Sequence, residues 1–125
     1  MALTAFVVDD HRLFRATARM LLESEGYNVV GEAEDGASAL TEVARLHPDV
    51  VLLDVQLPDA TGFDVARQVT SGRDGSRVVL VSSRSASEYG ELVEDCGAVG
   101  FIPKDQLSGQ SLGAALREGR SDEDR

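Results

Sequence analysis

Short apolar runs alternate with amphipathic stretches along the whole chain. The apolar runs predict five strands, at residues 3–8, 27–33, 49–53, 77–81 and 99–102. Helical spacing of apolar residues between them predicts five helices, at residues 13–25, 36–46, 63–69, 85–96 and 107–117. Strands with continuous apolar runs that alternate with helices imply a parallel sheet covered on both faces. We therefore expect a three-layer α/β/α domain, in a chain whose 125 residues suit a single domain.

The fourth predicted helix, at residues 85–96, has a sequence signal at each end. Ser85 and Glu88 have the spacing of a capping box, which starts helices, and Gly97 follows as a stop. Gly90 weakens the interior of this helix, because glycine has a low helix propensity. We expect one helix here, less stable than the others.

Polar residues follow four of the five predicted strands. Asp9 and Asp10 follow the first, Asp54 the third, Ser82 the fourth, and Lys104 comes soon after the fifth. In open parallel sheets the functional crevice lies beyond the carboxyl ends of the strands. The strand ends therefore predict one site that contains all five side chains.

Three carboxylates at one edge of a sheet repel one another, by about 4 kcal/mol for a close pair at intermediate dielectric. Oxygen-only ligands with no His or Cys nearby favour a hard cation, so the cluster predicts a site for Mg²⁺ or Mn²⁺. Lys104 is the only lysine beside eleven arginines. A compact ammonium at this edge would help to balance the charge and would suit a phosphoryl oxygen.

A cation site, a carboxylate, an ammonium and a hydroxyl together indicate phosphoryl transfer. Asp54 would attack as the nucleophile and become an acyl phosphate. The metal and Lys104 would hold the oxygens of the transferring group.

The order of these strand-end residues resembles the response-regulator receiver family over residues 3–118. Three stretches carry the resemblance: VVDDH at 7–11, DVVLLDVQLPDATGFD at 49–64 and GFIPK at 100–104. The acid pair followed by His11 is similar in style to receivers attached to helix-turn-helix DNA-binding domains. The resemblance implies a flavodoxin-like doubly wound sheet with strand order 2-1-3-4-5 and five helices.

The resemblance also implies roles at the site. Asp10 would bind Mg²⁺ directly, Asp9 largely through water, and the backbone carbonyl of Gln56 would complete the shell together with Asp54. A sensor histidine kinase or phosphotransfer protein would donate the phosphoryl group to Asp54. The domain would catalyse its own phosphorylation and dephosphorylation without being a turnover enzyme.

Further residues would transmit the signal or set the lifetime of the acyl phosphate. By the same resemblance Ser82 would move toward the phosphoryl group, and Phe101 would follow it inward and switch the face formed by the fourth helix, fifth strand and fifth helix. Gln56 and Arg84 lie two residues past Asp54 and Ser82, so we expect both to rim the site and tune hydrolysis of the acyl phosphate. Many receivers have proline directly after the lysine, whereas Asp105 stands here.

The composition of the chain indicates which classes of partner and which cellular compartment to expect. Asp and Glu total 22 against 12 Lys and Arg, a formal net charge of −10. Direct nucleic-acid binding needs a cationic surface, so it is not expected of this chain. A lone cysteine, Cys96, fits a reducing compartment, and no apolar run is long enough for a membrane, so we expect a cytoplasmic protein. We expect a receiver domain at residues 1–118 and a frayed acidic tail at 119–125.

Rival functions are less consistent with the sequence. A haloacid-dehalogenase-type phosphatase needs a second acid two residues after the nucleophile, where this chain has Gln56. A flavodoxin-like nucleotide binder needs a phosphate-binding first loop, where Asp9 and Asp10 would repel a phosphate. No P-loop motif is present. A degenerate receiver that only binds proteins remains an alternative. The chain could be a stand-alone receiver or one excised from a DNA-binding regulator, so its output partner would be a downstream domain or a separate protein. A phosphorylation-dependent homodimer is also open. His11 and His47 do not suggest a metal site, although His11 can line the site mouth.

Overall fold

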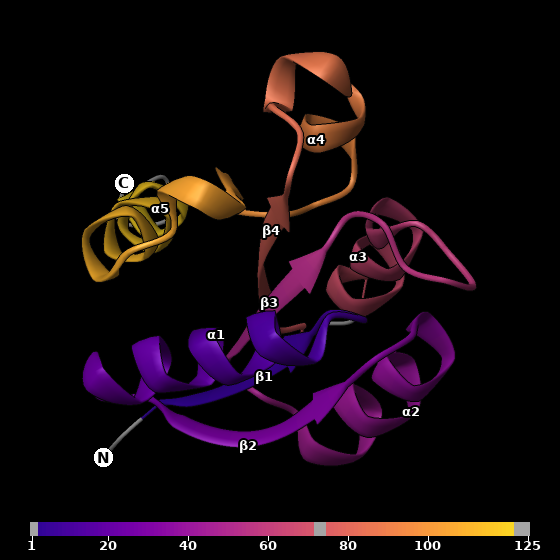
Figure 1. The fold of residues 1–125 in the computed structure, drawn as a ribbon. Coiled ribbons are helices and arrows are strands. Elements are labelled where there is room, and N and C mark those ends of the chain that lie inside the picture. The colour runs from indigo at the N-terminus through magenta and orange to yellow at the C-terminus, as the bar shows by residue number, and fades with distance from the viewer. Residues whose placement is uncertain (1–2, 72–74, 122–125) are drawn as a thin grey trace.

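The computed structural model describes residues 3–71 and 75–121 and contains one five-stranded parallel sheet (Figure 1). The strand order is β2-β1-β3-β4-β5, and every neighbouring pair is parallel. The strands are β1 (Thr4–Val8), β2 (Asn28–Ala33), β3 (Val50–Asp54), β4 (Arg77–Ser82) and β5 (Gly100–Pro103). The doubly wound flavodoxin-like sheet with order 2-1-3-4-5 is confirmed.

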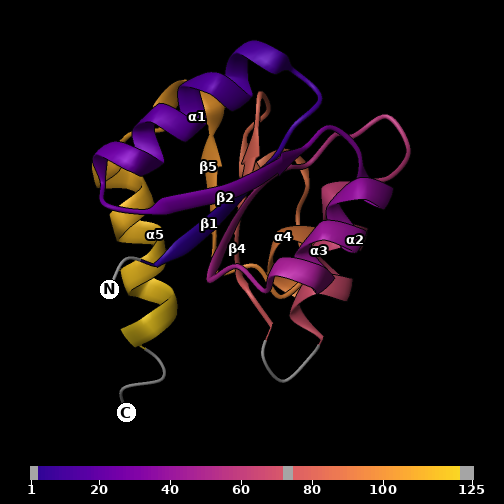
Figure 2. The ribbon, with the colours of Figure 1, turned by 90° about the horizontal axis from the view of Figure 1, so that it is seen from below.

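Within the described residues, five α-helices cover the two faces of the sheet. They are α1 (Arg12–Ser24), α2 (Gly36–Leu46), α3 (Gly62–Thr70), α4 (Leu92–Asp95) and α5 (Gly109–Ser121). α1 and α5 pack on one face, and α2, α3 and α4 lie on the other (Figure 2). This is the three-layer arrangement that the alternation of apolar runs and helices predicts.

The central strand β3 shows why the apolar runs are continuous. Val51 and Leu53 belong to the core under α2 and α3, whereas Val50 and Leu52 belong to the core under α1 and α5. All four are at most 1% exposed. Because successive side chains of a strand point to opposite faces, a strand covered on both sides must be apolar at every position.

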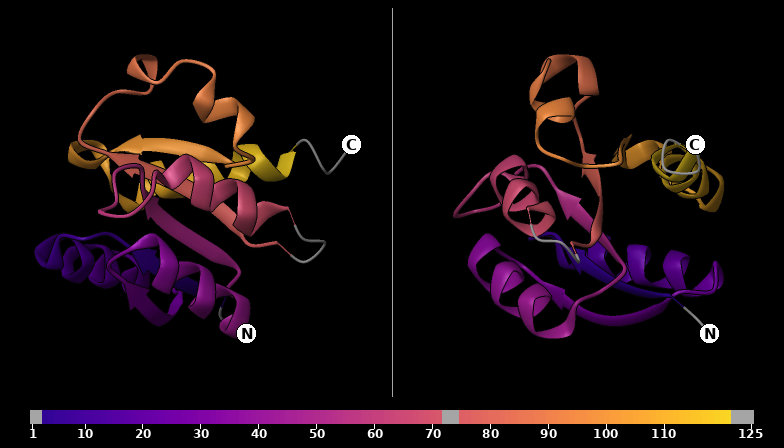
Figure 3. Two further views of the ribbon diagram at one scale, coloured as in Figure 1. Left: turned by 90° about the vertical axis from the view of Figure 1, so that its right-hand side faces the viewer. Right: turned by 180° about the vertical axis from the view of Figure 1, so that it is seen from behind.

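The segment 85–96 differs from the single helix that its end signals predict. It forms a 3₁₀ turn at Ala86–Glu88 and then the four-residue helix α4, joined by irregular chain (Figure 3). The capping box of Ser85 and Glu88 is present. Gly90, however, has φ of +62°, in the left-handed region that ends helices. The continuous-helix prediction was therefore wrong, and Gly90 interrupts the helix rather than only weakening it.

The C-terminal boundary also differs in detail. Residues Lys104–Gln106 form a 3₁₀ turn, so α5 begins at Gly109, and it continues through Ser121. The last part of the expected tail, 122–125, lies outside the described residues. Every peptide bond in the described part of the chain is trans, including the one between Lys104 and Asp105. No helix in that part has both the length and the apolar character needed to cross a membrane.

Candidate functional site

The sheet places the predicted acidic residues together at its carboxyl edge. Asp9 directly follows β1, and Asp54 is the last residue of β3. Asp9 is fully buried and Asp54 is 3% exposed, while Asp10 is exposed. Asp9, Asp10, His11 and Asp54 each offer a ligand atom, and these atoms all lie within 4.8 Å of one another. The predicted cluster is therefore present, with His11 added to it.

Lys104 reaches this cluster from the end of β5. Its Nζ lies 2.7 Å from Asp9 Oδ2 and 3.4 Å from Asp54 Oδ2. The contact with Asp9 is a close ion pair without hydrogen-bond geometry, so this buried oxygen has no hydrogen-bond partner among the described residues. The ring of Phe14 lies 4.5 Å below the ammonium, a cation–π contact that holds Lys104 from the side of α1. One ammonium faces three carboxylates, which leaves the cluster negative.

Burial and the neighbouring charges change the pKa of Asp54. Burial is the main cause that raises the pKa of Asp54 from 3.8 to about 6, and the charge of Asp9 is the second. Lys104 and the backbone N–H of Gln56, which donates to Asp54 Oδ1 over 3.3 Å, act in the opposite direction. A carboxylate in this state favours a proton or a cation. The oxygen-rich donor set fits a hard divalent ion.

The loop from β3 to α3 is held tightly against Asp54. Gln56 forms an isolated antiparallel bridge with Thr61, and Gly62 N–H donates to Val55 O over 2.6 Å. A Cβ at Gly62 would collide with the carbonyl oxygen of Asp54, so only glycine allows this approach.

A second tie comes from Asp59 in the same loop. Its carboxylate accepts the N–H groups of Gly36 and Ala37, over 2.7 and 3.0 Å, at the first turn of α2. These two bonds hold the pKa of Asp59 below its usual value. The loop that carries the Gln56 carbonyl is thereby anchored at both sides.

His11 lies at the mouth of the site, as the sequence allows. It is the N-cap of α1, and its Nδ1 lies 2.9 Å from Asp9 Oδ1 and 3.1 Å from Asp10 Oδ1. Sequence reasoning set His11 aside as a ligand, although its position directly after the acid pair was an available signal. The structure places the ring against both carboxylates.

Ser82 ends β4 and is 1% exposed. Its Oγ accepts the N–H of Arg84 over 3.0 Å and lies 2.9 Å from the hydroxyl oxygen of Tyr89. Sequence reasoning did not single out Tyr89, because it lies in the predicted interior of a helix. Tyr89 also contacts Phe101 of β5, with 5.9 Å between the two ring centroids.

The two residues expected to rim the site are both exposed. Gln56 reaches Asp54 through its backbone N–H. The guanidinium of Arg84 lies 3.5 Å from the carboxylate of Glu88 on the surface of the 3₁₀ turn.

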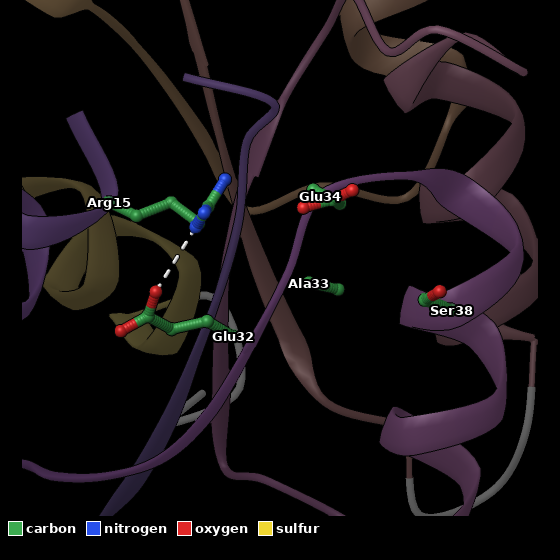
Figure 4. A pocket seen from close by; sticks show the side chains of 5 residues that line it. All are labelled: Arg15, Glu32, Ala33, Glu34 and Ser38. Atoms are coloured by element: carbon green, nitrogen blue, oxygen red, sulfur yellow. Dashed lines mark hydrogen bonds and ion pairs between the residues drawn. The ribbon is translucent and has the colours of Figure 1, made fainter. Parts of the chain in front are cut away.

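An open hollow lies beside the acidic cluster, between the end of β2 and the start of α2 (Figure 4). It is lined by Arg15, Glu32, Ala33, Glu34 and Ser38. Arg15 donates to the backbone carbonyl of Asp9 over 2.7 Å, and its Nε lies 3.1 Å from Glu32. Arg15 therefore supports the backbone of Asp9 and belongs to the frame of the site.

Comparison with known families agrees with this geometry. The family model described as the response regulator receiver domain matches residues 5–117. The chain belongs to the response regulator receiver family. It is a receiver domain of two-component response regulators, a family that does not consist of turnover enzymes. Its acidic cluster is typical of the magnesium site of receivers.

Several relatives of this receiver are transcriptional regulators. A relative named "Probable transcriptional regulatory protein NarL", of Mycobacterium tuberculosis, is 40% identical over 111 residues, which cover 88% of this chain and 51% of the relative. The DNA-binding transcriptional activator EvgA of Escherichia coli K12 is 32% identical over 102 residues, covering 82% and 50%. The chain thus spans about half the length of these curated relatives.

Solved structures show the same fold. The signal receiver domain of the Mycobacterium tuberculosis NarL has a TM-score of 0.83 at 38% identity, covering 95% of this chain and 97% of that one. The chemotaxis response regulator CheY4 of Vibrio cholerae, at 24% identity, has a TM-score of 0.81 and covers 95% and 99%. At that identity the likeness to CheY4 concerns the fold alone.

Proposed function

We propose that this receiver accepts a phosphoryl group on Asp54 from a phosphohistidine of a sensor kinase or phosphotransfer protein, in a reaction that requires Mg²⁺. The observation that carries the proposal is the placement of Asp54: a buried carboxylate at the end of β3, inside an acidic cluster, with Lys104 Nζ at 3.4 Å. One Asp54 oxygen attacks phosphorus, the bond from phosphorus to the donor imidazole breaks, and the imidazole leaves with the electron pair.

The residues that would hold the cation are Asp10, Asp54, the backbone carbonyl of Gln56 and, through water, Asp9. A divalent ion bound there would neutralise charge on the transferring phosphoryl oxygens. Mn²⁺ has similar ligand preferences and would substitute. Lys104 would exchange part of its contact with Asp9 for a phosphoryl oxygen, as a flexible ammonium can.

The readout would use the face of α4, β5 and α5. Ser82 would donate a hydrogen bond to the phosphoryl group, and charge-assisted bonds of this kind are stronger than neutral ones. Phe101, half-buried on β5, would rearrange with it. Gln56 and Arg84 would set the lifetime of the acyl phosphate from the rim of the site.

The partners follow from the same proposal. The phosphodonor protein would approach the site mouth, where α1 begins, and α1 carries the exposed apolar side chains of Leu13 and Met20, which are 84% and 71% exposed. The output would be transcriptional, as the names of NarL and EvgA say of those proteins. The net charge of −10 argues against contact of this domain itself with DNA. We place the protein in the cytoplasm and the receiver domain at residues 1–118.

The experiment is phosphorylation by acetyl phosphate, followed by intact mass, with Mg²⁺ or with excess chelator. The native protein should gain one phosphoryl group only with Mg²⁺, and Asp54→Asn should gain none. Asp64→Asn is the matched control, because Asp64 is an exposed aspartate on α3 whose partner is Arg67. Phosphorylation of Asp54→Asn, or undiminished reaction in chelator, would exclude the proposal. Folded native protein that is never phosphorylated would support the alternative, a receiver that acts only as a binding module.

A further inference from the structure

The hydroxyl of Ser82, which the proposed function needs at the phosphoryl group, is engaged elsewhere in this structure. Its Oγ accepts the N–H of Arg84 and lies 2.9 Å from the hydroxyl oxygen of Tyr89. A serine hydroxyl has one hydrogen to donate. When that hydrogen points to Tyr89 it is not available to a phosphoryl oxygen, and when Tyr89 is the donor it occupies an acceptor position and holds the same rotamer. In both cases Tyr89 competes with the acyl phosphate for Ser82.

The ring of Tyr89 is held by two aromatic side chains from different elements. Its centroid lies 5.2 Å from that of Phe63 in α3, in an edge-to-face arrangement with 69° between the planes. On the other side it lies 5.9 Å from Phe101 in β5. Both separations fall in the range of favourable aromatic pairs. Tyr89 therefore connects Ser82 with Phe101, the two residues that the resemblance pairs directly.

The segment that carries Tyr89 consists of short helical pieces that can move. Tyr89 lies between a three-residue 3₁₀ turn and the four-residue helix α4, and Gly90 after it has φ of +62°. Such short helical pieces have few internal hydrogen bonds, so a change at Tyr89 can move the segment without disrupting a long helix. Tyr89 is half-buried and contacts both switch residues, Ser82 through its hydroxyl and Phe101 through its ring.

We propose that Tyr89 is a latch: its hydroxyl holds Ser82 in the unphosphorylated state and must release it when Asp54 is phosphorylated, which frees the α4 segment. The proposal rests on the proposed function and adds to it the positioning residue that couples the site to the readout face. The bland alternative is that Tyr89 only fills space between Phe63 and Phe101. The two differ in what the hydroxyl alone does.

The test is a double-mutant cycle on the affinity for beryllofluoride with Mg²⁺, a phosphoryl mimic, measured by titration of amide signals. Tyr89→Phe removes a competing neutral hydrogen bond, so it should tighten the binding of beryllofluoride by about 2- to 10-fold. In a Ser82→Ala background the same substitution should have no effect, because no hydroxyl remains to compete for. Tyr27→Phe, at the only other tyrosine, is the matched control. It should leave the affinity for beryllofluoride unchanged in the native and in the Ser82→Ala background.

A second readout separates a latch from a packing role. In the Tyr27→Phe protein, 3-fluorotyrosine labels Tyr89 alone, and its ¹⁹F signal should shift on beryllofluoride binding and shift less in Ser82→Ala. An equal effect of Tyr89→Phe in both backgrounds, weaker binding by Tyr89→Phe, or an unmoved ¹⁹F signal would overturn the latch while leaving phosphorylation at Asp54 intact. If no variant bound beryllofluoride, the proposed function itself would fail, and the latch with it.

Discussion

Lys104 lies nearer to Asp9 than to Asp54: its Nζ is 2.7 Å from Asp9 Oδ2 and 3.4 Å from Asp54 Oδ2. Asp9 is fully buried, and a buried carboxylate without a cation is costly. The lysine therefore compensates the acidic cluster before any phosphoryl group arrives. The same ammonium also competes with a divalent ion for the charge of the cluster.

Replacing Lys104 with methionine should reveal this competition. Lys104→Met keeps a linear apolar stem and removes the charge, so we expect Mg²⁺ to bind about tenfold more tightly, which corresponds to about 1.4 kcal/mol. Calorimetric titration of Mg²⁺ measures the change. Lys104→Arg keeps a cation and should show a smaller increase. Unchanged or weaker Mg²⁺ binding by Lys104→Met would mean that the lysine does not compete with the ion.

The raised pKa of Asp54 predicts a pH-dependent stability. Burial, followed by the charge of Asp9, raises this pKa from 3.8 to about 6. The folded state then holds the proton more tightly than the unfolded state, so ionisation costs stability. The cost is absent below about pH 4, grows as pH rises through the folded pKa and is complete near pH 7. Such a shift corresponds to at most about 3 kcal/mol, and on the order of 2 kcal/mol once solvent at the open mouth is considered.

Urea unfolding of the native protein and of Asp54→Asn between pH 4 and pH 7 measures this cost. Without divalent ions, the free energy of unfolding of the native protein should fall relative to that of Asp54→Asn over this range. Mg²⁺ should diminish the fall, because it binds the ionised cluster. A difference between the two proteins that stays constant with pH would show that the carboxylate of Asp54 is not perturbed.

Gly62 should not tolerate a side chain. An added Cβ would collide with the carbonyl oxygen of Asp54 and would lie 2.8 Å from the Cα of Val55, and backbone atoms cannot yield as a side chain can. We expect Gly62→Ala to lower the free energy of unfolding by about 1–3 kcal/mol and to slow phosphorylation of the displaced Asp54.

Gly113→Ala is the matched comparison within α5, because its Cβ would approach only the flexible end of Arg117, at 3.1 Å. That substitution should raise the free energy of unfolding by about 0.5–1 kcal/mol through helix propensity. Chemical denaturation of both variants provides the measurement. A Gly62→Ala protein as stable as the native one would contradict the close approach of α3 to β3.

Arg84 and Gln56 should affect the lifetime of the acyl phosphate more than its formation. If the guanidinium obstructs water at the rim, Arg84→Ala should speed autodephosphorylation by up to about fivefold, the range expected for an exposed charge contact. Loss of phosphoprotein over time, compared with its rate of formation from acetyl phosphate, separates the two steps. Arg45→Ala is the control, because Arg45 pairs with Glu42 on α2 in a similar local ion pair. Hydrolysis unchanged in both Arg84→Ala and Gln56→Ala would remove these residues from the rim.

The order of the residues along the chain was enough to predict the sheet and the composition of the site. The continuous apolar runs identify strands covered on both faces, and in a parallel sheet the carboxyl ends of all strands lie at one edge. Residues that follow those runs, such as Asp9, Asp54 and Lys104, are therefore expected at the same edge of the sheet. The acidic cluster and its single ammonium could be predicted for this reason.

How these charged side chains are paired depends on the packing of distant elements. Whether Lys104 contacts Asp9 or Asp54 depends on differences of less than 1 Å between two carboxylates, which no sequence pattern encodes. The capping box at Ser85 is a local signal and appears as predicted, but the continuation of the helix depended on the backbone of Gly90. The role of Tyr89 depended on contacts with Phe63 and Phe101 from two other elements. Local signals lie within a few residues of the sequence, whereas these contacts exist only once distant elements have packed together.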